Sequence, residues 1–239
     1  ELPRLAHGKI LRARHPHARI VRIDGARARA LPGVLAVLTG GDVEPIPFGF
    51  ARDQTALKRG KVRCIRDEVA AVAAETPEIA QEALDLIRVE YVELPAIFDP
   101  LAALAPGAPL VHEELGTNAH HLRYRFAHGD VDRAFGQAAA VVEDAYRLNF
   151  VTPACLGTLV AIADWDHAEN LTMWTTTQVP FLYQKDLALA LGITGDRVRV
   201  LQPPVGGNFG RGLDLYPIDV IAALLARRAG RPVKIAFDR

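Results

Sequence analysis

The sequence of 239 residues has no serine and only two cysteines, Cys64 and Cys155. Without serine there is no serine nucleophile and no Gly-x-Ser-x-Gly elbow of a hydrolase. A pair of cysteines is too few for a disulfide framework, and too few for the thiolates that usually hold an iron–sulfur cluster. We therefore expect both to be plain buried thiols in a protein of the reducing cytoplasm.

The chain also lacks an excess of charge of one sign, since Lys plus Arg and Asp plus Glu both total 28. A neutral balance offers no electrostatic footprint for a nucleic-acid backbone or an anionic membrane. The apolar runs are short, because residues 69–74 and 221–226 fall far below the roughly 18 residues that suggest a membrane span. The sequence thus predicts neither nucleic-acid binding nor a membrane span.

What the chain does have is an alternation of strand-like and helix-like segments, with half of its residues hydrophobic. β-Branched enrichment predicts the strands, and apolar residues on one helical face, with Thr or Pro near the start of two segments, predict the helices. The predicted strands are residues 8–11, 18–23, 34–38, 88–92, 141–146, 158–163, 171–177, 197–201 and 233–237, and the predicted helices are residues 77–87, 131–139, 181–191 and 216–229. This alternation predicts a mixed fold of helices and strands, α/β (α+β).

Four prolines interrupt residues 94–109, and such a passage is typical of a linker. We place a domain boundary just beyond it, which divides the chain into residues 1–112 and residues 113–239. The last predicted strand, residues 233–237, has no later strand with which to pair. Because open strand edges recruit other chains, we expect the chain alone to be aggregation-prone or tightly partnered.

A glycine-rich segment, Gly206-Gly207-Asn208-Phe209-Gly210, lies between a predicted strand and a predicted helix. Glycine lets the backbone reach positive φ and approach a ligand, and successive N–H groups there can bind an anion or an oxo group. The spacing matches neither a dinucleotide fingerprint nor a phosphate loop. The residues alone leave two interpretations, a ligand cradle and a tight structural turn.

Gln178 lies at the end of a predicted strand and before a predicted helix. Ligands of α/β folds tend to bind at the carboxyl ends of strands, and the side-chain NH2 of a glutamine can donate a hydrogen bond into such a site. The alternative is that Gln178 caps the helix that follows.

Histidines and paired carboxylates carry no clear catalytic or metal signature. Neither the His15-Pro16-His17 pair nor the His120-His121 pair has a nearby Cys or carboxylate arranged like a zinc site, so we interpret them as solvated loop histidines. Adjacent acids, as in Asp67-Glu68 and Glu113-Glu114, are usually solvated stretches. We expect no catalytic residue and no direct metal ligand in this chain, so any chemistry comes from a cofactor or another chain.

Several short motifs, taken in order, resemble the large, molybdenum-binding subunit of the xanthine dehydrogenase and aldehyde oxidase family. The resemblance covers essentially the whole chain. Its motifs are His15-Pro16-His17-Ala18-Arg19-Ile20, Leu31-Pro32-Gly33-Val34, Val69-Ala70-Ala71-Val72-Ala73-Ala74-Glu75, Ala83-Leu84, Val89-Glu90-Tyr91, Leu94-Pro95-Ala96, His128-Gly129-Asp130-Val131, Thr177-Gln178-Val179-Pro180, Gly206-Gly207-Asn208-Phe209-Gly210 and Gly230-Arg231-Pro232-Val233-Lys234.

The resemblance implies an α/β hammerhead domain over residues 1–112, followed by the first part of a molybdenum cofactor-binding domain. It implies that Gln178 hydrogen-bonds an oxygen ligand of molybdenum, and that the loop containing Phe209-Gly210 lies beside the metal and the pterin. The family hydroxylates carbon with oxygen from water, or in one branch reduces an aromatic thioester. Electrons pass to 2Fe–2S and FAD units, which the resemblance places on partner subunits.

Some positions depart from the family pattern. Asn208 replaces the third glycine of the loop, and Arg211-Gly212 replaces the usual Gly-Lys. A frequent His-x3-Glu appears here as Pro153 and Gly157, and Arg66 replaces a glycine. These differences put the usual lining of the site in question.

The substrate is not read directly by these residues. Leu213 falls where xanthine-oxidising members carry a purine-binding Glu, so this candidate lining residue argues against a purine. Residues 45–49 and 175–180 look most like the hydroxybenzoyl-coenzyme A reductase branch, while aldehyde, nicotinate and carbon monoxide oxidising relatives remain open.

The family's catalytic Glu and most pterin contacts belong to sequence beyond Arg239. The resemblance therefore implies a chain that is inactive alone and shares molybdopterin, or its cytosine dinucleotide form, with a further portion or subunit. The expected partners are that portion, an iron–sulfur subunit, an FAD subunit and a small-molecule substrate. The alternatives are a non-catalytic assembly subunit and an independent small-molecule binding protein, the latter disfavoured by the unpaired last strand.

Overall fold

A computed structural model describes residues 2–120 and 123–238 of the chain. The strands are β1 (Ala6–Arg12), β2 (Ala18–Asp24), β3 (Val34–Thr39), β4 (Lys61–Val62), β5 (Glu68–Ala74), β6 (Arg88–Glu93), β7 (Val160–Trp165), β8 (Leu171–Thr175), β9 (Val198–Leu201) and β10 (Val233–Ala236). The α-helices are α1 (Ala26–Arg29), α2 (Pro77–Leu86), α3 (Pro100–Ala103), α4 (Val131–Gln137), α5 (Pro180–Leu191) and α6 (Pro217–Ala229). Short 3₁₀ helices are η1 (Glu113–Leu115), η2 (Gly195–Arg197) and η3 (Arg211–Leu213).

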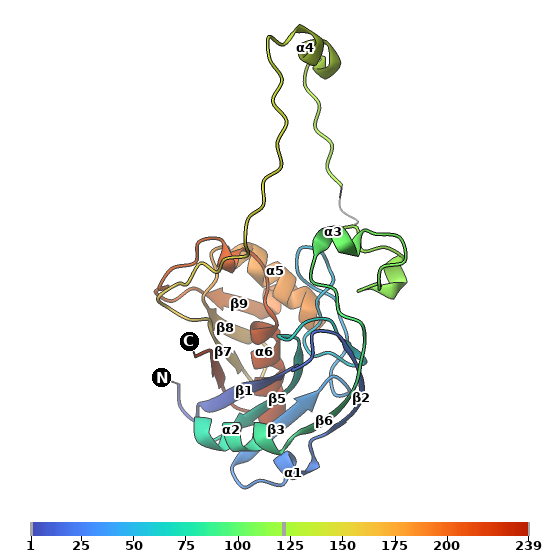
Figure 1. The fold of residues 1–239 in the computed structure, drawn as a ribbon. Coiled ribbons are helices and arrows are strands. Elements are labelled where there is room, and N and C mark those ends of the chain that lie inside the picture. Colours follow the sequence, from blue (N-terminus) through green and yellow to red (C-terminus); the bar gives the residue numbers. More distant parts are fainter. Residues whose placement is uncertain (1, 121–122, 239) are drawn as a thin grey trace.

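A mixed seven-stranded sheet in the order β3-β5-β1-β10-β7-β8-β9 forms the body of the molecule, and β4-β2-β6 form a smaller antiparallel sheet (Figure 1). Strand β1 comes from the start of the chain and β10 from its end, and they pair in parallel with Ala6 opposite Val233. Both parts of the chain thus contribute to one sheet. The mixture of sheets and helices confirms the predicted α+β class.

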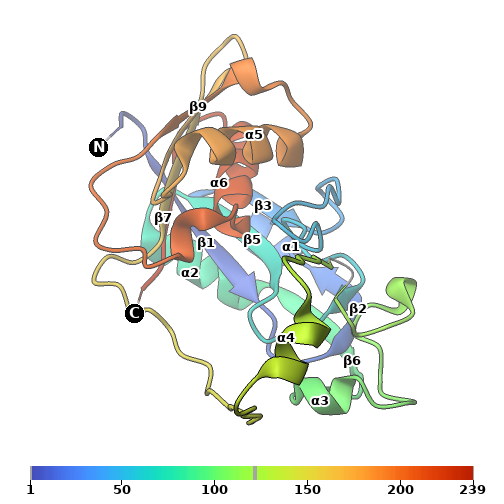
Figure 2. The same cartoon turned by 90° about the horizontal axis from the view of Figure 1, so that it is seen from above.

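Strand β5 shows how the main sheet is covered on both faces. All of its residues are buried, and it coincides with the short apolar run of residues 69–74. Ala70 and Val72 join an apolar cluster with α2, whereas Ala71 and Ala73 join the larger cluster that contains α6. Seen from above, α5 and α6 lie together over one face of the sheet (Figure 2). A strand buried on both faces reads as a continuous apolar run instead of an alternating one.

Helix α2 begins where the sequence predicts it. The Thr76 hydroxyl accepts a hydrogen bond from the Ile79 N–H at 3.2 Å, and Pro77 occupies the first turn. A threonine N-cap satisfies a helix N–H that would otherwise lack a partner, and proline needs no partner there. The buried face carries Ala83 and Leu84, which pack against the sheet.

The prediction that the last strand is unpaired is wrong. Strand β10 lies inside the main sheet, parallel to β1 on one side and antiparallel to β7 on the other. Val233 and Ile235 are fully buried. The sequence did not reveal the pairing because the partner β1 lies at the opposite end of the chain. Strand β10 therefore gives no open edge, and the aggregation expected from it loses its physical reason.

A long excursion leaves the body between α3 and β7. We call residues 123–154 the projecting segment; it consists of two extended arms joined at their tip by α4 (Figure 1). Every residue of it is exposed. Helix α4 confirms the predicted helix at 131–139, and its N-cap Asp130 accepts a hydrogen bond from the Arg133 N–H at 2.9 Å.

The predicted strand at residues 141–146 is wrong, because this stretch is extended but unpaired in the described part of the chain. Its β-branched residues favour a strand, yet a strand needs a neighbour to satisfy its backbone groups. The other predicted strands and helices lie within a few residues of observed ones. Over the described residues, no helix is both long enough and apolar enough to cross a membrane.

Candidate functional site

Three segments that are distant in the sequence meet beyond the ends of β8 and β9. They are residues 177–178 after β8, the glycine-rich loop of residues 206–212 after β9, and residues 155–157 at the end of the projecting segment. Gln178 donates its main-chain N–H to the Gly212 carbonyl at 2.9 Å, and Gly157 donates its N–H to the Gly206 carbonyl at 3.1 Å. The structure therefore brings together the glycine-rich loop and Gln178, which the sequence singled out separately.

The side chain of Gln178 is oriented by the loop. Its Oε1 accepts hydrogen bonds from the N–H groups of Gly210, at 3.2 Å, and Gly212, at 3.3 Å. Only the oxygen of an amide can face two donors, so the pattern fixes which end of the amide is which. The remaining NH2 group donates to no acceptor in the described residues, and the Gln178 side chain is exposed. It is free to donate to a ligand.

Gln178 does not cap helix α5, which corrects the alternative interpretation. The N-cap of α5 is Val179, and no side chain caps the helix. The residue that organises the turn is Thr177, whose hydroxyl donates to the Gly212 carbonyl at 3.2 Å and accepts from the Val179 N–H at 3.1 Å. The signal for this was available in the sequence, since threonine hydroxyls commonly bond to backbone groups two residues on.

The glycine-rich loop combines left-handed backbone with free donors. Gly207 has φ of 104° and Gly210 has φ of 93°, and Phe209 also has a positive φ, of 49°. A positive φ is unusual for a bulky residue and is found where the surroundings impose it. The N–H groups of residues 206–209 make no hydrogen bond within the described chain, and the Phe209 side chain is 80% exposed. Three of these donors lie on residues that are at least partly exposed, namely Gly206, Gly207 and Phe209, whereas Asn208 is buried.

The side chain of Asn208 lies beside Gly212. The Asn208 side chain is buried, and a Cβ added at Gly212 would lie 2.8 Å from its Nδ2. The amide therefore occupies the space that a side chain at position 212 would need. The Gln178 main-chain nitrogen would also lie 3.0 Å from that Cβ, so the backbone restricts the same space.

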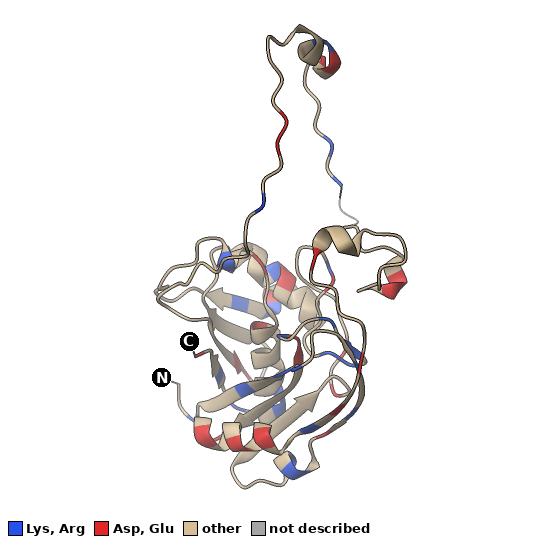
Figure 3. Ribbon diagram, viewed as in Figure 1, with Lys and Arg blue, Asp and Glu red and all other residues tan. Residues whose placement is uncertain are grey.

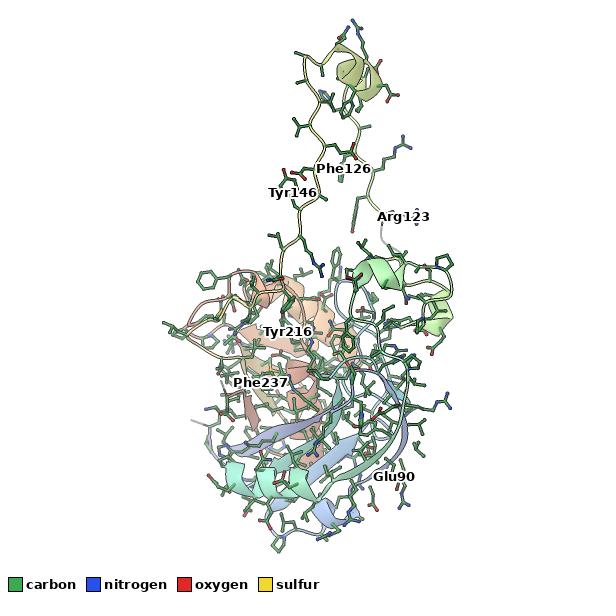
Figure 4. All side chains as sticks on the ribbon, viewed as in Figure 1. Glu90, Arg123, Phe126, Tyr146, Tyr216 and Phe237 are labelled. Atoms are coloured by element: carbon green, nitrogen blue, oxygen red, sulfur yellow. The ribbon has the colours of Figure 1, made fainter. Side chains whose placement is uncertain are left out.

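The hairpin of residues 48–54 approaches the loop from the first part of the chain. Asp214 Oδ2 accepts a hydrogen bond from the Phe50 N–H at 3.2 Å, and Leu213 beside it is 54% exposed. A cleft of about 690 Å³ lies near this contact, and its walls include Tyr216 and Phe237, both labelled in Figure 4. The sequence singled out residues 45–49 only for their resemblance to one branch of the family, and it did not reveal the contact between Phe50 and Asp214.

A buried ionisable pair lies behind the site, between α5 and α6. Tyr183 donates its hydroxyl proton to Asp219 Oδ2, and both side chains are almost fully buried. Burial raises the pKa of Asp219 to about 6, while burial and the neighbouring carboxylate raise the pKa of Tyr183 well above its usual value. The only sequence signal was an aspartate among the apolar residues of α6.

The histidines differ from their prediction at one position. His17 is buried, and its Nδ1 lies 2.6 Å from the Pro95 carbonyl oxygen, so it is not a solvated loop residue. His15 pairs with Glu93 at 3.2 Å. His121 lies outside the described residues. The described part of the chain contains no cluster of three or more side chains that could hold a metal ion.

Two other predictions need correction: that the Asp67-Glu68 pair is solvated, and that both cysteines are buried. Glu68 is buried at the start of β5, where burial raises its pKa, so the Asp67-Glu68 pair is not a solvated stretch. Glu113 is exposed and pairs with Lys61 at 2.6 Å, which agrees with the solvated interpretation of its own pair. Cys64 and Cys155 are free but only half-buried.

Comparison with known proteins identifies both parts of the chain. The family model "Aldehyde oxidase and xanthine dehydrogenase, a/b hammerhead domain" matches residues 1–95. The model "Molybdopterin cofactor-binding domain" matches residues 111–239.

Curated relatives include large subunits of two enzymes that act on pyridine compounds by name. The chain is 38% identical to the nicotinate dehydrogenase large molybdopterin subunit of Eubacterium barkeri, over 99% of this chain and 55% of that protein. It is 32% identical to the nicotine 6-hydroxylase large subunit of Paenarthrobacter nicotinovorans, over 98% of this chain and 30% of that protein. The chain therefore spans only about a third to a half of the length of these relatives.

Solved structures share the fold. Carbon monoxide dehydrogenase from Oligotropha carboxidovorans matches with a TM-score of 0.89 and 35% identity, covering 100% of this chain and 32% of that one. Quinoline 2-oxidoreductase from Pseudomonas putida 86 matches with a TM-score of 0.86 and 33% identity, covering 100% of this chain and 31% of that one.

Proposed function

The chain belongs to the molybdenum hydroxylase family, whose members are molybdopterin-dependent oxidoreductases, and from that premise we propose that its glycine-rich loop and Gln178 hold part of the molybdenum cofactor. Its place is in the cofactor-binding subunit of such an enzyme. The proposed residues are Gln178 and the loop Gly206-Gly207-Asn208-Phe209-Gly210.

The single observation that carries the proposal is the set of unused donors in one place. The NH2 group of Gln178 and the N–H groups of residues 206–209 have no acceptor in the described chain, while Oε1 of Gln178 is already held by Gly210 and Gly212. An oxygen-rich, anionic group fits such a row of donors. No side chain fills the position above Gly210, where a Cβ would meet nothing within 4 Å. The residues present thus fit the cofactor.

When bound, the cofactor supplies the redox centre, and the protein supplies binding and orientation. Gln178 donates its amide hydrogen to an oxygen of the cofactor, and its own orientation is fixed by the loop that it accepts from. We propose that this chain supplies no catalytic base and is inactive without a further cofactor-binding portion.

For the substrate, only a chemical class is proposed. Leu213 presents an apolar side chain beside the loop, 54% exposed, which suits an aldehyde or an aromatic or heteroaromatic carbon better than a polar purine edge. The cofactor is proposed as molybdopterin or its cytosine dinucleotide form. We propose that partner subunits carry the 2Fe–2S and FAD groups and that the complex is cytoplasmic. We also propose that residues 1–112 and residues 113–239 form two domains of this chain.

The alternative of a purely structural assembly role was suggested by Asn208 and Gly157. In the structure both contribute to the loop: Asn208 fills the space beside Gly212, and Gly157 bonds the Gly206 carbonyl. These residues therefore build the proposed site in a different way instead of abolishing it.

Molybdenum and pterin analysis of the native assembly, combined with two variants of Gln178, tests the proposal. Gln178→Glu keeps a carboxylate oxygen for the N–H groups of Gly210 and Gly212 but removes the donor. We expect Gln178→Glu to fold normally, with molybdenum content or turnover lowered about tenfold to a hundredfold, because a charge-assisted hydrogen bond contributes about 1.5 to 3 kcal/mol.

Gln178→Ala removes both the acceptor and the donor, so we expect the same loss together with a lower melting temperature. An assembly that lacks molybdenum and pterin would overturn the proposal. So would a Gln178→Glu enzyme with unchanged metal content and unchanged turnover.

A further inference from the structure

Arg211 links two segments of the site that are distant in the sequence. Its Nη2 donates to the Gly157 carbonyl at 3.1 Å and to the Gly207 carbonyl at 3.2 Å, and it lies 3.5 Å from Asn208 Oδ1. The side chain is half-buried, and Nε is buried without an acceptor in the described chain. A guanidinium is a rigid, permanently charged fork of donors, so it can serve several oxygen acceptors at once.

The two segments that Arg211 joins meet backbone to backbone. A Cβ added at Gly206 would lie 2.5 Å from the Gly157 nitrogen, and one added at Gly157 would lie 3.0 Å from the Gly206 nitrogen. No side chain at either position can therefore help to hold the contact. Two hydrogen bonds cross it, from the Gly157 N–H to the Gly206 carbonyl and from the guanidinium to the Gly157 carbonyl.

The loop needs such a restraint because its conformation is unusual. Phe209 has φ of 49° and lies between Gly207 and Gly210, which also have positive φ. The ring of Phe209 folds back toward Gly207, since a Cβ added at Gly207 would lie 3.1 Å from Phe209 Cε2. The guanidinium bonds the Gly207 carbonyl, and the main-chain N–H of Arg211 bonds the Asn208 carbonyl at 2.9 Å. Both bonds hold carbonyl groups within the stretch of backbone that carries the free donors.

We infer that Arg211 is a positioning residue of the cofactor loop. By holding the carbonyls of Gly157 and Gly207, it sets the direction of the N–H groups of residues 206–209 and the place of Phe209. This inference rests on the proposed function, because the ligand that the donors meet is the proposed cofactor.

Hydrogen exchange of the assembled enzyme tests the restraint directly. The amides of Gly157, Gly210 and Gly212 donate hydrogen bonds in the site and should be protected. In Arg211→Met, which keeps much of the length of the side chain and loses every donor, we expect these amides to exchange about tenfold faster or more, because the local opening becomes easier. In Arg211→Lys a single ammonium replaces the fork, and we expect an intermediate rate.

The effect on the cofactor is read from molybdenum content and from the electron paramagnetic resonance spectrum of reduced molybdenum. We expect Arg211→Met to lower the content or to broaden the spectrum, and Arg211→Lys to restore part of both. Arg227→Lys is the matched control, because Arg227 pairs with Glu169 at the far end of α6. It should leave exchange in the loop and the spectrum unchanged.

The outcomes separate this inference from the proposed function. Wild-type exchange rates in Arg211→Met would overturn the restraint whether or not molybdenum is present. Faster exchange with an unchanged metal content and an unchanged spectrum would show a structural role only and overturn the positioning role. An assembly without molybdenum would fail the proposed function and, with it, the positioning role, while the exchange rates would still report on the restraint.

Discussion

The main sheet and the projecting segment treat apolar side chains in opposite ways. In the sheet, β5 is buried along its whole length, and Met173 of β8 and Ile221 of α6 are fully buried. In the projecting segment Phe126 is 91% exposed and Phe150 is 97% exposed. Figure 4 shows Phe126 and Tyr146 on the two arms, away from the body. The two regions both carry large apolar side chains, and their surroundings differ.

From this difference in burial we propose that the projecting segment packs against polypeptide outside this fold. Its arms carry charged residues of both signs as well as large exposed apolar side chains (Figure 3), and exposed apolar surface is typical of an interaction site. The main sheet, by contrast, packs its apolar side chains against helices of this same fold.

The largest expected loss of stability comes from a substitution in the main sheet. Met173→Ala removes a side chain that is fully buried between the sheet and its helices. Deleting such a side chain loses its burial and leaves a cavity, so we expect the free energy of unfolding to fall by about 2 to 5 kcal/mol. Denaturant unfolding of the protein measures it. A loss below about 1 kcal/mol would contradict this packing, because an average substitution already costs about 1 kcal/mol and a fully buried side chain should cost more.

A smaller effect, dependent on pH, is expected at Asp219 in α6. Burial raises its pKa to about 6 in the folded protein, from an ordinary value of 3.8. A raised carboxyl pKa means that the protonated form stabilises the fold below about pH 4, and that this contribution is lost as the pH rises through about 6. Between about pH 5 and pH 7.5 we expect the wild type to lose on the order of 1 kcal/mol of stability relative to Asp219→Asn, which does not titrate.

Urea unfolding of the wild type and Asp219→Asn at both pH values measures this difference, and the variant cancels the contribution of every other titrating group. A difference between the two proteins that does not change with pH would contradict the raised pKa. Tyr183→Phe is a useful companion, because it removes the hydroxyl that donates to Asp219 and should raise the pKa of the carboxyl further.

Local signals in the sequence predicted most of the elements, although not strand β5, and they did not predict which elements are neighbours. The cap at Thr76 and the apolar face of α2 lie within one stretch of chain, so the helix was found with its start. The pairing of β10 with β1 joins opposite ends of the chain, as Ala6 and Val233 do. The strand predicted at 141–146 failed for the same reason, since β-propensity describes side chains and does not supply a partner.

The site divides in the same way. Gln178 and the glycine-rich loop were identified from their residue types at strand ends, and the structure joins them through Gly210 and Gly212. Thr177 and Arg211 were missed as functional residues, because their importance lies in contacts with Gly212 and Gly157 that no spacing reveals. The Tyr183 to Asp219 pair was missed because its members lie on different helices.

The smallest effect is expected in the projecting segment, at Phe150. Its side chain is 97% exposed, so Phe150→Ala removes almost no buried surface from this fold, and we expect the free energy of unfolding of the isolated chain to change by less than about 0.5 kcal/mol. If the arms are covered in the assembly, the same substitution should weaken association with the covering polypeptide, because truncated aromatic side chains at interfaces commonly cost more than about 1 kcal/mol. Unfolding of the isolated chain and titration of the assembly, with Phe150→Leu as the control that keeps apolar surface, measure the two effects. A large loss of stability in the isolated chain, or an assembly that tolerates Phe150→Ala without loss of affinity, would remove the distinction between the two regions.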